Sequence, residues 1–198
     1  QRLEEYIQRK KLGDHVILLG WQENPYPHMK AADIIVCSSI YEGLSTVVTE
    51  ALILGKASHM RELDLELTLM QNSSLPEHSR YLSSSELVTV VGNLMENAIE
   101  AANTTPMDRY RGVAVQLTED EKGLFIMVGD TGEGISEENL PHIYEAGFST
   151  KAKKGRGVGM GRIKEIVDSH GGTIDVDTEP GSGTTFTIIF SRERGGIQ

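Results

Sequence analysis

The sequence is poor in cysteine, in aromatic residues and in basic charge. Cys37 is the only cysteine among 198 residues, so no internal disulfide can form, which is typical of the reducing cytoplasm. Basic residues number 19 against 29 acidic ones, and the net charge of -10 argues against a general nucleic-acid binder. No apolar run approaches the roughly 20 residues of a spanning helix, and we expect no signal peptide. These absences favour a cytoplasmic domain without nucleic-acid or membrane partners.

Residues 1–56 carry an alternating pattern of helices and apolar strands. We expect a helix over 1–13 ended by Gly13 and a buried strand over 15–21, "HVILLGW". A short helix in "NPYPHMKAA", a strand in "DIIVCSS" and a helix over 44–56 closing at Gly55 then follow. The alternation predicts parallel pairing in a short βαβα fragment of Rossmann-like α/β character. Its buried strands need neighbours, so we expect it to pack on the rest of the chain or on another copy.

The pattern changes after residue 60. A strand over 63–69 precedes a long helix over 83–103, with Ser85 or a neighbour as its cap. Two hairpins, over 112–130 and 173–190, flank a glycine-rich loop and a helix over 159–172. Such runs of strands and helices predict an α+β fold, a two-layer α/β sandwich.

Two asparagines in the long helix are candidate metal and phosphate ligands. Asn93 and Asn97 are four residues apart, so their amides project from the same helix face. Neutral carbonyl oxygens suit Mg²⁺, which takes few protein ligands beside phosphate oxygens. Two asparagines alone are more often surface or capping residues.

Two glycine-rich stretches are candidate nucleotide contacts. Asp130 ends an apolar strand and can accept a hydrogen bond from an exocyclic amine, while Gly132 and Gly134 allow close backbone approach; a simple turn is the alternative. The second stretch precedes a helix and offers bare amides and a helix N-terminus to an anion, with a flexible hinge as the alternative. Its glycines are Gly155, Gly157 and Gly159, and basic residues including Lys151 and Arg156 lie beside them.

The order of these motifs strongly resembles the catalytic, ATP-binding domain of sensor histidine kinases. The fold is shared with DNA gyrase, a heat-shock chaperone family and mismatch-repair ATPases, and "VGNLMENAIEA" and "GFSTKAKKGRGVGMGRIKEIV" are most similar to the citrate and dicarboxylate sensors. The resemblance implies that Asn97 ligates Mg²⁺, that Asn93 lies on the phosphate side, and that Asp130 reads adenine. It further implies an ATP lid over 148–154 and ATP contacts from Gly132, Gly134, Thr150, Lys151, Gly155, Arg156, Gly157, Gly159 and Thr184.

The sequence departs from the family pattern in two respects. Glu100 stands where many members carry a basic residue one turn after the second asparagine, so Lys151 or Arg156 would have to supply that contact. The phosphoacceptor helix is also missing, and His78 fits a surface position in a proline-containing loop. The resemblance therefore implies a partial kinase that binds ATP and Mg²⁺ but needs a histidine phosphoacceptor domain, and a response regulator, as partners. The parent kinase would be anchored in a membrane with this domain in the cytoplasm.

A second resemblance covers about residues 14–56. "NPYPHMKAADIIVCSSIYEGLSTVVTEAL" is similar to the C-terminal nucleotide-sugar-binding domain of GT-B retaining glycosyltransferases. Glu42 and Glu50 match the family's Glu-x7-Glu motif, which implies a vestigial nucleotide-sugar site; two solvated glutamates on a helix are the alternative. Catalysis is not expected, because the acceptor domain and most of the donor sheet are missing.

The two patterns predict three segments. These are a glycosyltransferase-like fragment (1–56), an engineered join (57–60) and the kinase domain (61–198). The join, Ala-Ser-His-Met, is the translation of two adjacent cloning sites. The functions that fit are Mg-ATP binding, residual nucleotide-sugar binding, or a folding and assembly chimera without activity of its own.

Overall fold

A computed structural model of the chain describes residues 2–20, 28, 31, 45–70, 73, 79–145, 147–148 and 159–191. The chain divides into two compact units, Gln1–Ile35 and Val36–Gln198.

The first unit contains helix α1, Arg2–Arg9. Lys11 takes a left-handed conformation with φ of 54°, and the Leu12 amide donates to the Ile7 carbonyl oxygen at 3.0 Å. This arrangement closes a helix. The expected end at Gly13 is therefore wrong, because a lysine takes the left-handed position two residues earlier.

The strand expected over 15–21 is wrong for the part that the structure describes. Residues 15–20 form no strand, and their apolar side chains from Val16 to Leu19 are exposed, Ile17 by 80%. A buried strand is stable only between neighbouring strands and under a covering layer. The described residues of this unit supply neither.

The second unit is built on a five-stranded sheet with the order β1-β2-β3-β5-β4. β1 pairs with β2 in parallel, and all other neighbours are antiparallel. The two expected hairpins after residue 60 are thus confirmed, while the strand expected over 63–69 begins only at Glu66, because residues 63 and 64 form a turn. The strands are β1 (Glu66–Leu69), β2 (Gly112–Glu119), β3 (Gly123–Asp130), β4 (Thr173–Glu179) and β5 (Gly183–Ser191).

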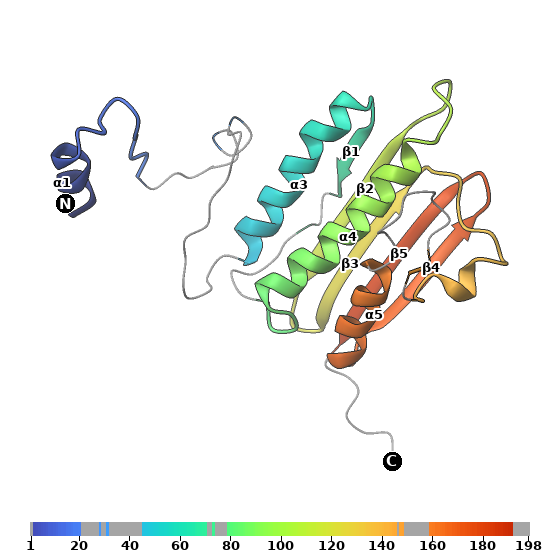
Figure 1. The fold of residues 1–198 in the computed structure, drawn as a ribbon. Coiled ribbons are helices and arrows are strands. Elements are labelled where there is room, and N and C mark those ends of the chain that lie inside the picture. Colours follow the sequence, from blue (N-terminus) through green and yellow to red (C-terminus); the bar gives the residue numbers. More distant parts are fainter. Residues whose placement is uncertain are drawn as a thin grey trace, which may run out of the picture. The chain divides into compact units, whose positions relative to one another are not determined.

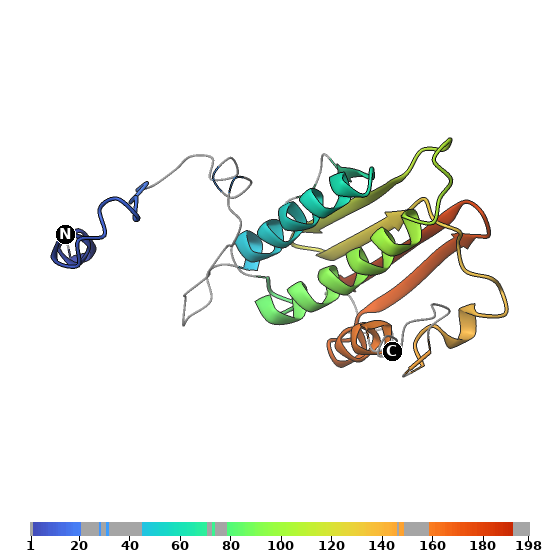
Figure 2. The same ribbon diagram turned by 45° about the horizontal axis from the view of Figure 1, so that its top comes forward.

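Three helices form a layer on one face of this sheet (Figure 1, Figure 2). They are α3 (Ser45–Glu62), α4 (Ser84–Ala102) and α5 (Gly159–Ser169); a short 3-10 helix, η1 (Leu140–His142), precedes α5. α4 buries eight side chains and contacts β2, β3 and both other helices. One continuous core lies between the two layers, so the α+β class is confirmed.

Helix α3 does not end at Gly55 but runs on to Glu62, through residues 57–60. Asp64 takes the left-handed conformation, with φ of 56°, and the Leu65 amide donates to the Met60 carbonyl oxygen at 2.8 Å. The Met60 side chain is fully buried in the same core as that of Leu65. The tetrapeptide expected as a linker is therefore a helical, partly buried part of this unit.

The C-terminal ends of α3 and α4 are tied together by Arg111, which is only 8% exposed. Its Nη1 donates to the Leu63 carbonyl oxygen at 3.1 Å, and its Nη2 donates to the Asn103 Oδ1 at 3.0 Å. A helix C-terminus carries about half a negative charge, so two such ends together offset one guanidinium. Farther along the two helices, Lys56 forms an ion pair with Glu96. Residues 45–56, the described end of the glycosyltransferase-like segment, thus pack on the kinase-like part, which is one of the two arrangements expected.

Candidate functional site

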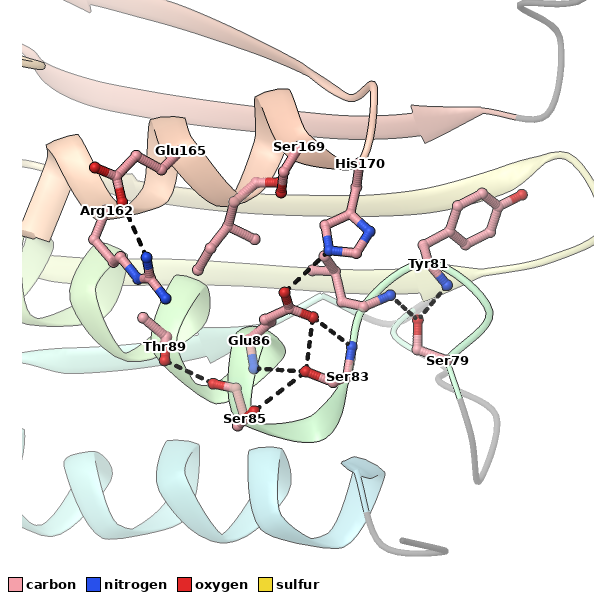
Figure 3. A network of polar contacts seen from close by, with 12 residues as sticks. Ser79, Tyr81, Ser83, Ser85, Glu86, Thr89, Arg162, Glu165, Ser169 and His170 are labelled. Atoms are coloured by element: carbon pink, nitrogen blue, oxygen red, sulfur yellow. Dashed lines mark hydrogen bonds and ion pairs between the residues drawn. The ribbon is translucent and has the colours of Figure 1, made fainter.

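Helix α4 is the platform of the site, and a capping box fixes its start (Figure 3). Ser83 Oγ accepts from the Glu86 amide at 3.3 Å, while Glu86 Oε2 accepts from the Ser83 amide at 2.9 Å. The cap is therefore Ser83, a neighbour of Ser85, within the range that the sequence allowed.

Asn93 lies where α4 meets the first residue of α5. Its Nδ2 donates to the Thr89 carbonyl oxygen at 2.7 Å, which orients the amide. A Cβ added to Gly159 would lie 2.6 Å from Asn93 Oδ1, so a larger residue here would require the Asn93 amide to shift. Asn97, one turn farther along the same helix, is partly exposed. The structure thus brings Asn93 and Gly159 together, with Asn97 next along the helix.

Asp130 lies at the end of β3, opposite Thr184 on β5. Its Oδ1 accepts from the Gly132 amide at 2.7 Å, which folds the following loop back on the strand end. A Cβ on Gly132 would lie 2.6 Å from the Ala101 Cβ of α4. The structure therefore places the Asp130 loop directly against α4, two turns beyond Asn93.

Two more glycines make close approaches around this loop. Gly134 has φ of 74°, and an added Cβ would overlap the Glu179 carbonyl oxygen; Gly183, with φ of 116°, is equally close to the Asp130 carbonyl oxygen. The expectation was that Gly132 and Gly134 make room for a ligand. In the structure both also make room for neighbouring protein backbone.

Three threonines that the sequence analysis did not single out hold the loop in place. Thr131 Oγ1 accepts from the Gly112 amide at 3.0 Å, and Thr105 Oγ1 donates to the Thr131 carbonyl oxygen at 2.6 Å. Thr178 Oγ1 accepts from the Ile135 amide at 2.9 Å and contacts the buried Thr184 Oγ1 at 3.0 Å. Thr131 is the middle residue of the Asp-x-Gly motif, so the sequence could have identified it as a residue that holds this loop.

Several expected site residues lie outside the described part of the chain. They are Glu42, Thr150, Lys151, Gly155, Arg156 and Gly157, together with the rest of the expected lid after Phe148. Glu50 is described only as part of the α3 backbone.

Two ionisable groups near the helix pair have displaced pKa values. The hydrogen bonds from Ser83 and from His170 lower the pKa of Glu86 from 4.5 to about 2. Burial raises the pKa of Tyr144, and the nearby carboxylates Asp175 and Asp168 raise it further. Among the described residues, no cluster of three His, Cys, Asp or Glu side chains could hold a metal ion.

The fold and the order of these elements agree with the family comparison. Residues 83–194, more than half of the chain, match the model described as "Histidine kinase-, DNA gyrase B-, and HSP90-like ATPase". The chain belongs to this family, and within it resembles the citrate and dicarboxylate sensor kinases.

The curated relatives are longer proteins. A probable C4-dicarboxylate sensor kinase of Halalkalibacterium halodurans is 38% identical over 144 residues, which covers 73% of this chain and 27% of the relative. The sensor protein CitS of Bacillus subtilis is 30% identical over 155 residues, which cover 78% of this chain and 28% of CitS. The chain thus spans less than a third of these relatives. No helix among its described residues is long and apolar enough to cross a membrane.

Solved structures support the fold. The mycobacterial sensor histidine kinase MprB superposes with a TM-score of 0.55 at 24% identity, covering 74% of this chain and 93% of that one. The catalytic domain of the histidine kinase ThkA superposes with a TM-score of 0.59 at 19% identity, and the match covers 74% of this chain and 91% of that one.

A second family model, "Glycosyl transferases group 1", matches residues 1–58. The two similarities overlap. The alignments to the curated kinases cover at least 144 residues, more than the stretch from residue 61 to residue 198 contains, so they include residues before Arg61. The kinase similarity therefore begins before Arg61, and the join expected at residues 57–60 stays a prediction.

Proposed function

We propose that the second unit is the Mg-ATP-binding catalytic domain of a sensor histidine kinase. One observation carries this proposal: α4 holds both ends of one elongated site. Asn93 meets Gly159 at one end, and Ala101 meets the Asp130 loop at the other. Eight residues of helix separate them, about 12 Å at 1.5 Å per residue. This length suits a nucleotide with its base at Asp130 and its phosphates at Asn93.

The proposed roles follow from this orientation. Asp130 accepts a hydrogen bond from the adenine amine, Gly132 and Gly134 line the base, and Thr184 supports the strand behind it. Asn97 offers an amide oxygen to Mg²⁺, which would neutralise phosphate charge when bound. The phosphate contacts are proposed for the amides of the glycines before α5 and for nearby side chains, namely Gly155, Gly157, Gly159, Thr150, Lys151 and Arg156.

Phosphoryl transfer needs a histidine from a separate domain, because none of the histidines fits an acceptor helix. The relatives' names as sensor kinases support a response regulator as the downstream partner. We place the ATP-binding unit in the cytoplasm, in agreement with the single cysteine.

Calorimetry on the 198-residue chain tests the proposal, with Mg-ATP and ADP as ligands and UDP-glucose as control. We expect adenine-nucleotide binding with a dissociation constant between micromolar and millimolar. Asn97→Ala should remove the Mg²⁺-dependent part of the affinity, and Asp130→Asn should weaken discrimination for adenine. If both variants bind Mg-ATP as the unchanged chain does, the site lies elsewhere.

The match of residues 1–58 to a glycosyltransferase model supports a fusion of two protein families. We infer that they meet at residues 57–60, where Ala-Ser-His-Met is the translation of two cloning sites and forms part of helix α3. Residual nucleotide-sugar binding through Glu42 and Glu50 is the second candidate function. UDP-glucose binding that is lost in Glu50→Ala would support it; otherwise this segment is a passenger in a chimera.

A further inference from the structure

The described residues hold a second contact between α4 and α5, at the N-terminal end of α4 and just past the C-terminal end of α5. Glu86 Oε1 lies 3.0 Å from His170 Nε2, and Figure 3 shows the two side chains pointing toward each other. Glu86 belongs to the first turn of α4, and His170 follows the last residue of α5. The two helices are thus joined once near each end of α5.

Both partners of this contact are held in place by other groups. The second oxygen of Glu86 accepts from the amide and the hydroxyl of Ser83, at 2.9 and 2.7 Å. The His170 ring stands edge-on to the buried ring of Phe190, with centroids 6.4 Å apart and an interplanar angle of 82°. A pair with both partners oriented in advance loses little side-chain entropy when it forms, unlike an ordinary surface ion pair.

At the other end, the backbone of Gly159 lies close to the Asn93 side chain. An added Cβ on Gly159 would already lie 2.6 Å from Asn93 Oδ1, so rotation of α5 against α4 changes this distance directly. α5 buries only Ile163, Ile166 and Val167. A short helix with three buried side chains depends on the contacts at its ends to fix its angle relative to α4.

Building on the proposed function, we propose that the Glu86–His170 pair is a latch that positions α5, and with it the phosphate end of the nucleotide site. Glu86 and His170 are positioning residues that act through Gly159 and Asn93 and do not touch the nucleotide. The base end of the site, at Asp130 and Ala101, rests on β3 and α4 and does not involve α5. The latch therefore affects phosphate binding and leaves base binding unchanged.

The test compares two ligands on the full chain. Mg-ATP and adenosine are titrated by calorimetry into the unchanged chain, His170→Ala, His170→Gln and Glu86→Gln. Asp168→Asn is the matched control, because it removes an ion pair with Lys164 that lies within α5 and does not reach α4. We expect His170→Ala to weaken Mg-ATP binding by about threefold to tenfold, a common size for coupling through packed contacts.

Adenosine affinity should stay the same in every variant. His170→Gln should recover part of the Mg-ATP affinity, because its amide can still donate to Glu86. Glu86→Gln keeps an acceptor for the α4 cap and should weaken the binding of Mg-ATP but not of adenosine. Unchanged Mg-ATP affinity in His170→Ala, or an equal loss for both ligands, would overturn the latch while leaving the proposed function in place. If the unchanged chain binds neither ligand, the proposed function fails and the latch falls with it.

Discussion

Replacing Gly55 by alanine distinguishes the two descriptions of helix α3. In the structure Gly55 lies inside the helix, its surroundings are open, and its φ is negative. Alanine at such a position stabilises a helix by about 0.5–1 kcal/mol relative to glycine. If Gly55 instead ended the helix in a left-handed conformation, as the sequence suggested, alanine would destabilise it by about 1 kcal/mol. The sign of the effect is therefore decisive.

Urea unfolding, followed by far-ultraviolet circular dichroism, measures this effect. A stabilisation of 1 kcal/mol corresponds to about 2–4 °C in melting temperature for a domain of this size. Gly171→Ala is the matched control, because Gly171 also has open surroundings but has φ of 67°. We expect opposite signs for the two variants. A loss of stability in Gly55→Ala would refute the continuous helix and restore a boundary before residues 57–60.

Three further substitutions probe the second unit. Gly183→Ala should lower the free energy of unfolding, measured in urea, by about 2 kcal/mol or more, because the new Cβ overlaps the Asp130 carbonyl oxygen at a positive φ. Ser83→Ala should cost about 1 kcal/mol through loss of the α4 cap. Hydrogen bonds from Ser83 and from His170 together lower the pKa of Glu86 to about 2, so the stability they give is complete above pH 4.5 and is lost as the pH falls toward 2. The variant lacks the Ser83 hydroxyl, so its acid titration should show a smaller loss over that range. Arg111→Lys should lower the melting temperature, because one ammonium cannot reach the carbonyls of both helix ends; an unchanged value would contradict the proposed tie.

The sequence predicted the parts of the fold that local patterns determine. The β2–β3 hairpin followed from two apolar stretches around Lys122 and Gly123, and Asp120 accepts from both of their amides. The start of α4 followed from a run of serines before an amphipathic stretch. In both cases the deciding interactions join residues only a few positions apart, so the sequence contains them directly.

The errors have a common physical cause. Both helix ends were assigned to a glycine, Gly13 after the end of α1 and Gly55 inside α3, whereas Lys11 and Asp64 take the left-handed positions. Which residue bears this strain depends on the contacts that follow the turn, such as Leu65 packing beside Met60 in the core. Contacts of that kind cannot be inferred from glycine positions alone. The strand expected over 15–21 likewise depended on neighbours that local sequence does not report.

The site shows how far a motif specifies geometry. The spacing of Asn93 and Asn97 placed both on one helix face, but not beside any particular partner. The glycines then explain the assembly, because the Cβ atoms they lack leave room for Asn93 Oδ1 and for Ala101. Glycines that bring backbone close to α4 at two points also fix the distance between those points. In the proposed site, the eight residues of α4 between Asn93 and Ala101 would set the length of nucleotide that fits.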